Sequence, residues 1–258
     1  MKLFCDGVFD LFHEGHVKHF KKIKELYPNS YLMVGIYNDK DSTGYKRKPF
    51  YNEKKRLRLV GSCKYVDEVT LDYPGIMTEE FINKNNIDMI VHAFSNINDI
   101  EKQKIYFEVP IRLNKMKVIE YNKGVSTTKI IANLTNNNAS ELDLSESESK
   151  KINLNYKEIV YKLDIKPNSK VLEVGCGIGN YSKLFNVNFD YYGIDNNREN
   201  VNKNIYTTNS NIVKCEYDDI LFKDNYFDHC FCIGQDLSTE AMNEINRVTK
   251  NDNIFIKD

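Results

Sequence analysis

Two histidines three residues apart, His13 and His16, open the first candidate helix with Gly15 between them. At that spacing both imidazoles lie on one face of a helix. The first turn of a helix offers unpaired N–H groups and the positive end of its dipole, which together bind phosphate. Imidazoles there could donate to phosphate oxygens whose charge grows during nucleophilic attack, which is electrostatic catalysis. Taken alone, the pair could also be two exposed histidines or a metal pair, although no third ligand lies nearby in the sequence.

These residues sit in a repeating pattern of short apolar runs and amphipathic segments. Such an alternation predicts a parallel sheet with helices on both faces. The expected strands are residues 2–5, 31–37, 66–71, 89–92 and 117–121, and the expected helices are 14–26, 52–62, 78–85 and 127–134.

A polar break, TNNNASELDLSESESKK over residues 135–151, interrupts this pattern. It has too few apolar side chains to fold, so we expect a linker. The sequence therefore predicts a first domain at 1–134, a linker at 135–152 and a second α/β domain at 153–258. The strands expected after the break are 170–174, 191–194, 212–215, 229–233 and 253–257, with a helix at 239–249.

Composition narrows the class of protein. A formal net charge of −1 over 258 residues gives no general attraction to nucleic acid. No apolar run reaches the roughly 20 residues of a membrane span, and the N-terminus does not read as a signal peptide. The six cysteines lack zinc or disulfide spacing, which favours inert thiols in a reducing, cytoplasmic setting.

Four segments of the first domain carry a family resemblance: DGVFDLFHEGH (6–16), Lys46, CKYVDEV (63–69) and KGVSTTKII (123–131). In order and spacing they resemble the choline- and ethanolamine-phosphate cytidylyltransferases over about residues 2–134. The resemblance implies a Rossmann-like, doubly wound fold with ligands at the carboxyl ends of the strands. It also implies that CTP, with Mg²⁺, is joined to a phosphorylated alcohol such as phosphoethanolamine or phosphocholine, releasing pyrophosphate. The implied partners are these small molecules, and a homodimer stays open.

The same resemblance implies roles for individual residues. His13 and His16 would hold the CTP phosphates, and Lys46 would bridge the phosphates of the two substrates. Asp6 would face the ammonium group of the alcohol. The remaining residues of the implied CTP and substrate site are Gly7, Val8, Phe9, His92, Gly124, Val125, Ser126, Thr127 and Thr128.

Three positions depart from the family pattern. Tyr121 stands where the family has an arginine, Ala93 where it has an acid, and Gly75 where it has an aromatic residue that contacts the alcohol. Trp is absent from the chain, and Tyr73 could compensate. These departures leave two alternatives open. One is a catalytically impaired nucleotide-binding or regulatory protein. The other is a nucleotidyltransferase that uses ATP or another alcohol, such as glycerol 3-phosphate.

A second glycine motif, VLEVGCGIGN over residues 171–180, follows the break. A strand entering such a turn serves NAD, S-adenosylmethionine or tight packing. With Asp195, Glu216 and YFD (226–228) it resembles a class I S-adenosylmethionine-dependent methyltransferase over about residues 155–258. The resemblance assigns Glu173, Gly175, Gly177 and Gly179 to the methionine side of the cofactor, Asp195 to the ribose and Glu216 to the adenine. The chain ends at the fifth expected strand, so we expect a truncated domain, and a cofactor-free Rossmann-like domain is the alternative.

Overall fold

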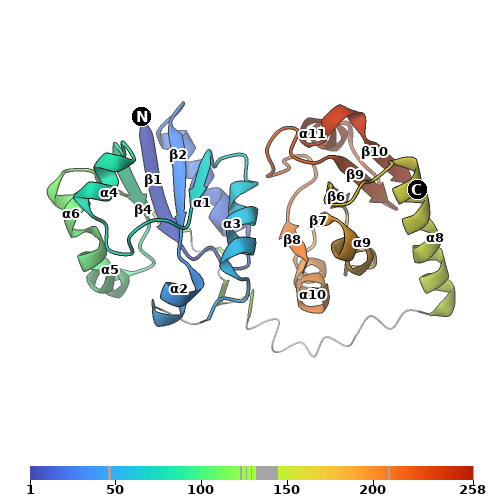
Figure 1. Cartoon of the computed structure of the whole chain (residues 1–258), viewed down its shortest axis with the longest axis horizontal. Helices are drawn as coiled ribbons and strands as arrows, with labels where there is room; N and C mark the ends of the chain where they lie inside the picture. The colour runs from blue at the N-terminus through green and yellow to red at the C-terminus, as the bar shows by residue number, and fades with distance from the viewer. Residues whose placement is uncertain are drawn as a thin grey trace. The chain divides into compact units, whose positions relative to one another are not determined.

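The computed structural model describes residues 1–45, 48–122, 124–125, 127–128, 130–131, 145–208 and 210–257. The chain divides into two compact units, Met1–Thr127 and Thr128–Asp258, and each is described by itself (Figure 1). Both are α/β units built on a five-stranded parallel sheet, as the sequence predicts.

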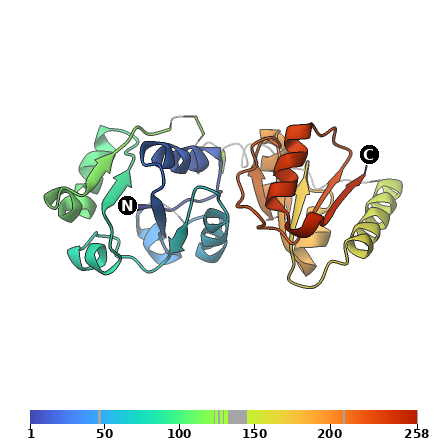
Figure 2. The same ribbon diagram turned by 90° about the horizontal axis from the view of Figure 1, so that it is seen from above.

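The first unit carries its sheet in the order β3-β2-β1-β4-β5. Helices flank this sheet on both sides (Figures 1 and 2). Its elements are β1 (Lys2–Gly7), α1 (Glu14–Leu26), β2 (Tyr31–Ile36), α2 (Asp39–Tyr45), α3 (Glu53–Gly61), β3 (Glu68–Thr70), α4 (Glu79–Lys84), β4 (Met89–His92), α5 (Ile97–Gln103), the 3₁₀ turn η1 (Lys104–Phe107), α6 (Glu108–Arg112) and β5 (Met116–Val118).

The strand register places the candidate site residues at one edge. Gly7 at the end of β1 pairs with Ile36 at the end of β2, and His92 at the end of β4 pairs with Val118. Since all five strands run parallel, their carboxyl ends meet at the same edge of the sheet. Asp6 and His92 therefore lie at the edge where doubly wound sheets bind ligands.

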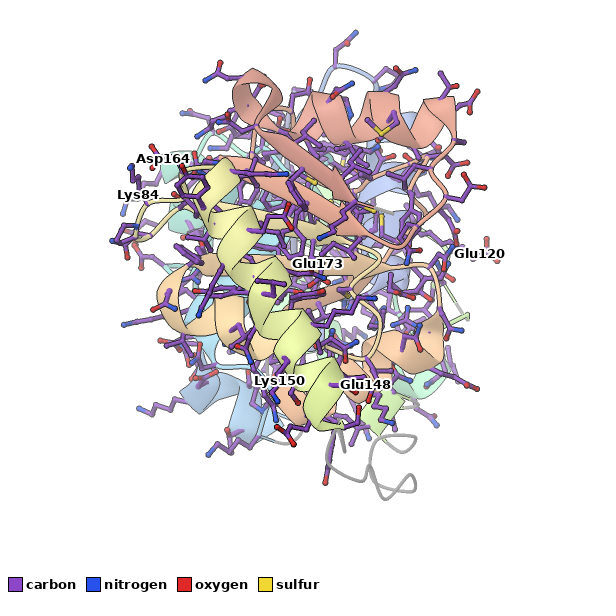
Figure 3. All side chains as sticks on the ribbon, turned by 90° about the vertical axis from the view of Figure 1, so that its right-hand side faces the viewer. Lys84, Glu120, Glu148, Lys150, Asp164 and Glu173 are labelled. Atoms are coloured by element: carbon purple, nitrogen blue, oxygen red, sulfur yellow. The ribbon has the colours of Figure 1, made fainter. Side chains whose placement is uncertain are left out.

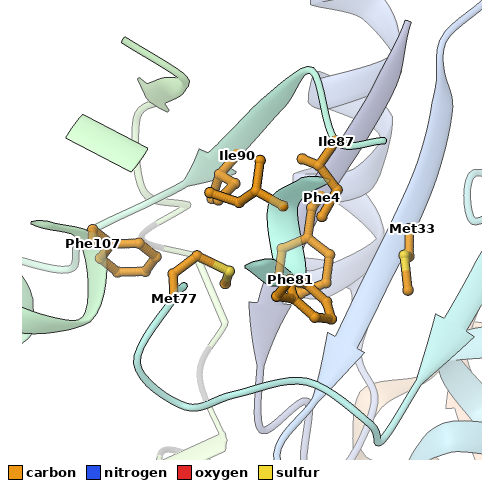
Figure 4. Close-up of a cluster of buried hydrophobic side chains, with 8 residues drawn as sticks. Phe4, Met33, Met77, Phe81, Ile87, Ile90 and Phe107 are labelled. Atoms are coloured by element: carbon orange, nitrogen blue, oxygen red, sulfur yellow. The ribbon is translucent and has the colours of Figure 1, made fainter. Parts of the chain in front are cut away.

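An apolar cluster on one face of the sheet holds β1, β2 and β4 against α4 and η1 (Figure 4). Phe4 lies at its centre, with ring centroids 5.4 Å from Phe81 and 5.5 Å from Tyr73. The cluster consists of Phe4, Met33, Met77, Phe81, Ile82, Ile87, Ile90 and Phe107. This packing fixes the strands whose ends carry the candidate site.

The second unit has the sheet order β10-β9-β6-β7-β8. The glycine motif lies directly after β6, the central strand. Its elements are α8 (Glu146–Lys162), β6 (Lys170–Val174), α9 (Ser182–Asn188), β7 (Asp190–Asp195), α10 (Arg198–Thr208), β8 (Asn211–Lys214), β9 (His229–Ile233), α11 (Thr239–Val248), the 3₁₀ turn η2 (Lys250–Asp252) and β10 (Ile254–Lys257).

Helix α8 begins inside the segment expected to be a linker, so that expectation is wrong for residues 146–152. Ser145 accepts from the Glu148 N–H, and the Glu148 side chain accepts from the Ser145 N–H, which is a reciprocal capping box. An i, i+4 pair between Lys150 and Glu146 supports the first turns. Residues 135–144 of the expected linker lie outside the described residues.

No helix within the described ranges is both long and apolar enough to cross a membrane.

Candidate active site

His13 and His16 form the amino-terminal cap of α1 reciprocally. His13 is the N-cap residue, and its Nδ1 accepts from the Gly15 N–H at 3.1 Å. The His16 Nδ1 accepts from the His13 N–H at 3.4 Å. The two rings stack with their centroids 3.8 Å apart. The sequence placed both imidazoles on one helix face, and the structure brings them together there.

These two hydrogen bonds fix the tautomer of each ring. A ring nitrogen that accepts from a backbone N–H carries no proton, so a neutral imidazole must carry its proton on Nε2. Burial, together with the nearby His13 and His19, lowers the pKa of His16 well below its usual value. His16 is therefore a neutral Nε2–H donor at neutral pH.

Val125 and Thr127 lie against this helix start. A Cβ on Gly15 would meet the His13 ring at 2.9 Å and the Val125 carbonyl oxygen at 3.0 Å, so only glycine fits there. The Thr127 hydroxyl donates to the Asp10 carbonyl at 3.1 Å and lies 3.4 Å from His13 Nε2. The structure thus brings Thr127 to His13, and the contact with phosphate that the resemblance implies for Thr127 stays a prediction.

The loop after β1 is held in an unusual backbone conformation. Phe9 and Leu11 have φ values of 51° and 50°, a region that non-glycine residues seldom adopt. Asp10 between them is buried, and its carboxylate accepts from the Phe50 and Tyr51 N–H groups at 2.8 and 2.9 Å. A Cβ on Gly7 would meet the Phe9 ring at 3.0 Å. Asp10 was not assigned a role from the sequence. Its position between Phe9 and His13, two predicted site residues, is the sequence signal that could have identified it.

Arg56 fixes the same loop from α3. The side chain is fully buried, and its guanidinium donates to the Val8 carbonyl at 2.7 Å, to the Tyr51 carbonyl at 3.0 Å and to the Asp39 carboxylate at 2.7 Å. It therefore joins the loop after β1 to α2 and to the start of α3. Arg56 was not predictable from the sequence, because nothing in a single chain marks which arginine of a helix turns inward.

Asp6 and His92 meet across the sheet edge. His92 Nδ1 lies 3.3 Å from Asp6 Oδ1, and both side chains are largely buried. His19, one turn beyond His16, lies close to Asp6 and His92. Burial and the nearby His92 lower its pKa to about 4, and Asp6 acts in the opposite direction. His19 was not predicted as a site residue, although its spacing continues that of the histidine pair.

The other site positions named from the sequence are exposed or lie outside the described residues. Lys46 and Ser126 lie outside the described residues. Gly124 and Thr128 are exposed, and Gly124 N–H bonds the Asn122 side chain at 3.2 Å. Tyr121, where the family has arginine, has an exposed fraction of 37%.

The glycine loop of the second unit has the backbone that its sequence predicts. Gly175, Gly177 and Gly179 have φ values of 77°, 52° and 104°, which favour glycine. A Cβ on Gly177 would meet nothing within 4 Å, so a ligand could approach its backbone. A Cβ on Gly175 would meet the Gln235 side chain at 2.4 Å, so Gln235 covers that part of the loop.

Asp195, at the end of β7, is buried beside this loop. Its carboxylate accepts from the Gly177 N–H at 2.9 Å, the Asn197 N–H at 2.8 Å and the Asn200 amide at 3.3 Å. A carboxylate offers about four acceptor sites. One acceptor site therefore remains, and the bond from Asn200 is the longest of the three.

Glu173 lies in the interior of the second unit (Figure 3). The Tyr191 hydroxyl donates to it at 2.5 Å and itself accepts from Ser182 at 3.0 Å. Burial raises the pKa of Glu173 to about 8, against the Tyr191 hydrogen bond. Glu216, by contrast, is exposed and pairs with Lys214. Their assigned contacts with a cofactor remain predictions.

A cavity of about 490 Å³ opens at the carboxyl ends of β9 and β10, close to the glycine loop. Gln235, which covers Gly175, is one of its lining residues. The lining combines polar and apolar side chains: Gly234, Gln235, Asp236, Leu237, Met242 and Ile256.

Within the described ranges, no group of three or more His, Cys, Asp or Glu side chains is placed to hold a metal ion. The first site offers imidazole and backbone N–H donors, which suit phosphate oxygens.

Comparison with known proteins matches two parts of the chain to two different families. Residues 4–133 match the cytidylyltransferase-like family, and residues 172–256 match a methyltransferase domain. Choline-phosphate cytidylyltransferase 2 of Arabidopsis thaliana is 35% identical over 132 residues, 51% of this chain and 43% of that protein. Ethanolamine-phosphate cytidylyltransferase of Dictyostelium discoideum is 32% identical over 134 residues, 52% of this chain and 36% of that protein.

The matched region spans less than half the length of these relatives. Among solved structures, the lipopolysaccharide core biosynthesis protein of Thermoplasma volcanium is 25% identical, with a TM-score of 0.39 over 48% of this chain and 98% of that one. Since the family match covers half of the chain and includes the histidine pair, the chain belongs to the cytidylyltransferase-like family and carries a methyltransferase domain after it.

Proposed function

We propose that the first unit transfers a cytidylyl group from CTP to a phosphorylated alcohol, giving a CDP-alcohol and pyrophosphate. The observation that carries this proposal is the stacked pair of Nε2–H donors at the start of α1. The family match and the names of the relatives, choline- and ethanolamine-phosphate cytidylyltransferases, support it.

An oxygen of the alcohol's phosphate attacks the α-phosphorus of CTP. The new oxygen–phosphorus bond forms as the bond to the β-phosphate breaks, and pyrophosphate leaves with the electron pair. The attacking phosphate oxygen is already ionised, so the chain need not remove a proton. His13 and His16 stabilise the charge that grows on the phosphate oxygens, and the backbone N–H groups of α1 add to this. Mg²⁺ carried by the triphosphate would neutralise further charge.

The direct test is pyrophosphate release by the intact protein, scanned over nucleotides and phosphorylated alcohols. CTP with phosphoethanolamine or phosphocholine should release pyrophosphate and yield the CDP-alcohol. Release only with ATP, or only with glycerol 3-phosphate, would replace this assignment by another nucleotidyl transfer.

A catalytically impaired nucleotide-binding protein is the second candidate for this unit. The exposed Tyr121 favours it, because tyrosine cannot supply the two-pronged phosphate contact of the family's arginine. The two candidates differ in one measurement: an impaired protein would bind CTP in calorimetry and release no pyrophosphate with any alcohol.

For the second unit we propose that it binds S-adenosylmethionine. The open backbone of Gly177 beside the buried Asp195 carries this proposal, and the match to a methyltransferase domain supports it. Gly175, Gly177 and Gly179 would admit the methionine part, and Asp195 would receive the ribose hydroxyls. The cofactor would supply an activated methyl group, and the cavity beside Gln235 is our candidate binding site for the methyl acceptor.

We also propose that the protein is cytoplasmic and forms a homodimer. Cell fractionation tests the location, and sedimentation tests the oligomeric state.

A further inference from the structure

Gly175, the first glycine of the second unit's motif, is covered by a side chain that comes from the neighbouring strand. Strands β6 and β9 pair with Val174 opposite Cys232, and Gln235 follows two residues after the end of β9. A Cβ on Gly175 would lie 2.4 Å from Gln235 Cγ, 2.5 Å from its Cδ and 2.8 Å from its Nε2. The Gln235 side chain therefore rests directly on the Gly175 backbone, and only a glycine leaves room for it.

The other end of the loop is uncovered. A Cβ on Gly177 would meet nothing within 4 Å, and the Gly177 N–H donates to Asp195 at 2.9 Å. In the sheet, β6 lies between β9 and β7, and Asp195 ends β7. A cofactor whose ribose binds Asp195 takes the β7 side, so its methionine part is left with Gly175 and the β9 side. Gln235 lies where that part would contact the loop.

The Gln235 side chain has room to leave this place. It lines the cavity of about 490 Å³ at the carboxyl ends of β9 and β10, next to the exposed Gly234. Its closest atoms to Gly175 are carbons, and contacts between single pairs of carbon atoms are weak. A glutamine side chain also has several rotatable bonds with alternative staggered positions. Rotation about these bonds carries it from the glycine loop into the cavity.

We propose that Gln235 is a gate over the methionine half of the cofactor site. With the gate closed, the loop admits a nucleoside at Asp195 but not an amino-acid part attached to that nucleoside. A ligand with the amino-acid part binds only those molecules in which Gln235 has moved into the cavity, so its apparent affinity falls by that fraction. Gln235 thereby disfavours the complete cofactor relative to a shorter nucleoside. This inference rests on the proposed binding of S-adenosylmethionine.

The test is calorimetry on the intact protein with two nucleosides that differ in the amino-acid part. S-adenosylhomocysteine carries this part, and methylthioadenosine lacks it. Gln235→Ala should tighten the binding of S-adenosylhomocysteine by about tenfold, as expected if about one molecule in ten is open. The affinity for methylthioadenosine should stay within about twofold, because that ligand does not need the gate to open.

Two further variants separate the gate from other roles of this residue. Gln235→Met keeps a flexible side chain of similar length without the amide, so it should bind S-adenosylhomocysteine as the unmodified protein does. Met242→Ala shortens another side chain that lines the cavity, from α11, and should change neither affinity. Thermal unfolding without ligand establishes that each variant is folded.

Weaker binding of S-adenosylhomocysteine to Gln235→Ala would make Gln235 a cofactor contact and overturn the gate. Equal tightening of both nucleosides, or no change in either, also overturns the gate while the proposed cofactor site stands. Binding of S-adenosylhomocysteine by Gln235→Ala alone supports both proposals and means that the unmodified protein is closed. If neither protein binds either nucleoside, the gate and the proposed cofactor site fail together.

Discussion

The imidazole rings of His13 and His16 stack 3.8 Å apart, and each accepts a backbone N–H of the helix start through Nδ1. The stacking would be unfavourable between two imidazolium ions, and the lowered pKa of His16 keeps that ring neutral. Both Nε2–H groups are thereby oriented before any substrate binds, which avoids a reorganisation cost during reaction.

Removing one of these donors should reduce catalysis. We expect His16→Ala to lower kcat for pyrophosphate release by about a hundredfold or more, because a transition-state hydrogen bond is lost. Thermal unfolding should show a folded protein, since the lost cap contact is worth only about 1 kcal/mol. Lys18→Ala, an exposed neighbour on α1, is the control. Unchanged turnover in His16→Ala would remove the catalytic role of this residue.

The Glu173 carboxyl should make the second unit sensitive to high pH. A folded pKa of about 8 exceeds the usual value of 4.5, so the folded state binds this proton more tightly than the unfolded chain. The contribution to stability is full below about pH 4.5 and is lost as pH rises through about 8. Glu173→Gln should abolish this loss, which is on the order of 5 kcal/mol at most.

Urea unfolding of both proteins from pH 5 to pH 9 measures the difference. Carboxyl ¹³C NMR of Glu173 gives the midpoint directly. A midpoint near 4.5 would show that the carboxylate is ionised in the interior, and the pH dependence would then not arise from Glu173.

Limited proteolysis should separate the two units. The segment 135–144 contains few apolar side chains, so we expect the first cleavage there. An N-terminal fragment ending near residue 134 should remain folded by circular dichroism. Loss of both units together after this single cut would contradict the domain boundaries proposed from the sequence.

The second unit should bind S-adenosylmethionine or its demethylated product in the micromolar range, about −8 kcal/mol. Asp195→Ala should weaken binding by roughly 1–3 kcal/mol, because the ribose hydroxyls lose their acceptor. Calorimetry measures both values. The same measurement on Glu216→Gln, a change at an exposed residue of this unit, tests the contact with adenine that was assigned to Glu216. The absence of heat and of a thermal shift at millimolar ligand would leave the unit without a cofactor.

Much of the fold follows from local patterns. The central strands are continuous apolar runs, and β4, β6 and β9 begin and end where the sequence predicts. Helices α2, α5 and α10 were not predicted, since they are short or polar and their formation depends on caps and tertiary packing. Helix α8 was missed for a related reason: one capping residue, Ser145, outweighs a composition that suggests a linker.

The residues of the candidate sites were likewise predictable only in part. His13, His16 and Thr127 could be named because they occur in a recognisable spacing. Asp10 and Tyr191 act through contacts with distant segments, 41 and 18 residues away, which no local pattern encodes. The charge state of Glu173 depends on burial by the whole unit and was not predictable from its neighbours.

Arg56 limits the amino-acid substitutions that this protein can tolerate. One guanidinium satisfies carbonyl oxygens and a carboxylate from three separate segments. Lysine carries the charge but lacks the fork of donors, and an apolar residue would leave the Val8 and Tyr51 carbonyl oxygens without this donor. In a library covering every single substitution, position 56 should tolerate almost none. Tolerance there would require simultaneous changes at Asp39 and in the backbone around Val8, so this anchor constrains the evolution of the loop beside the histidines.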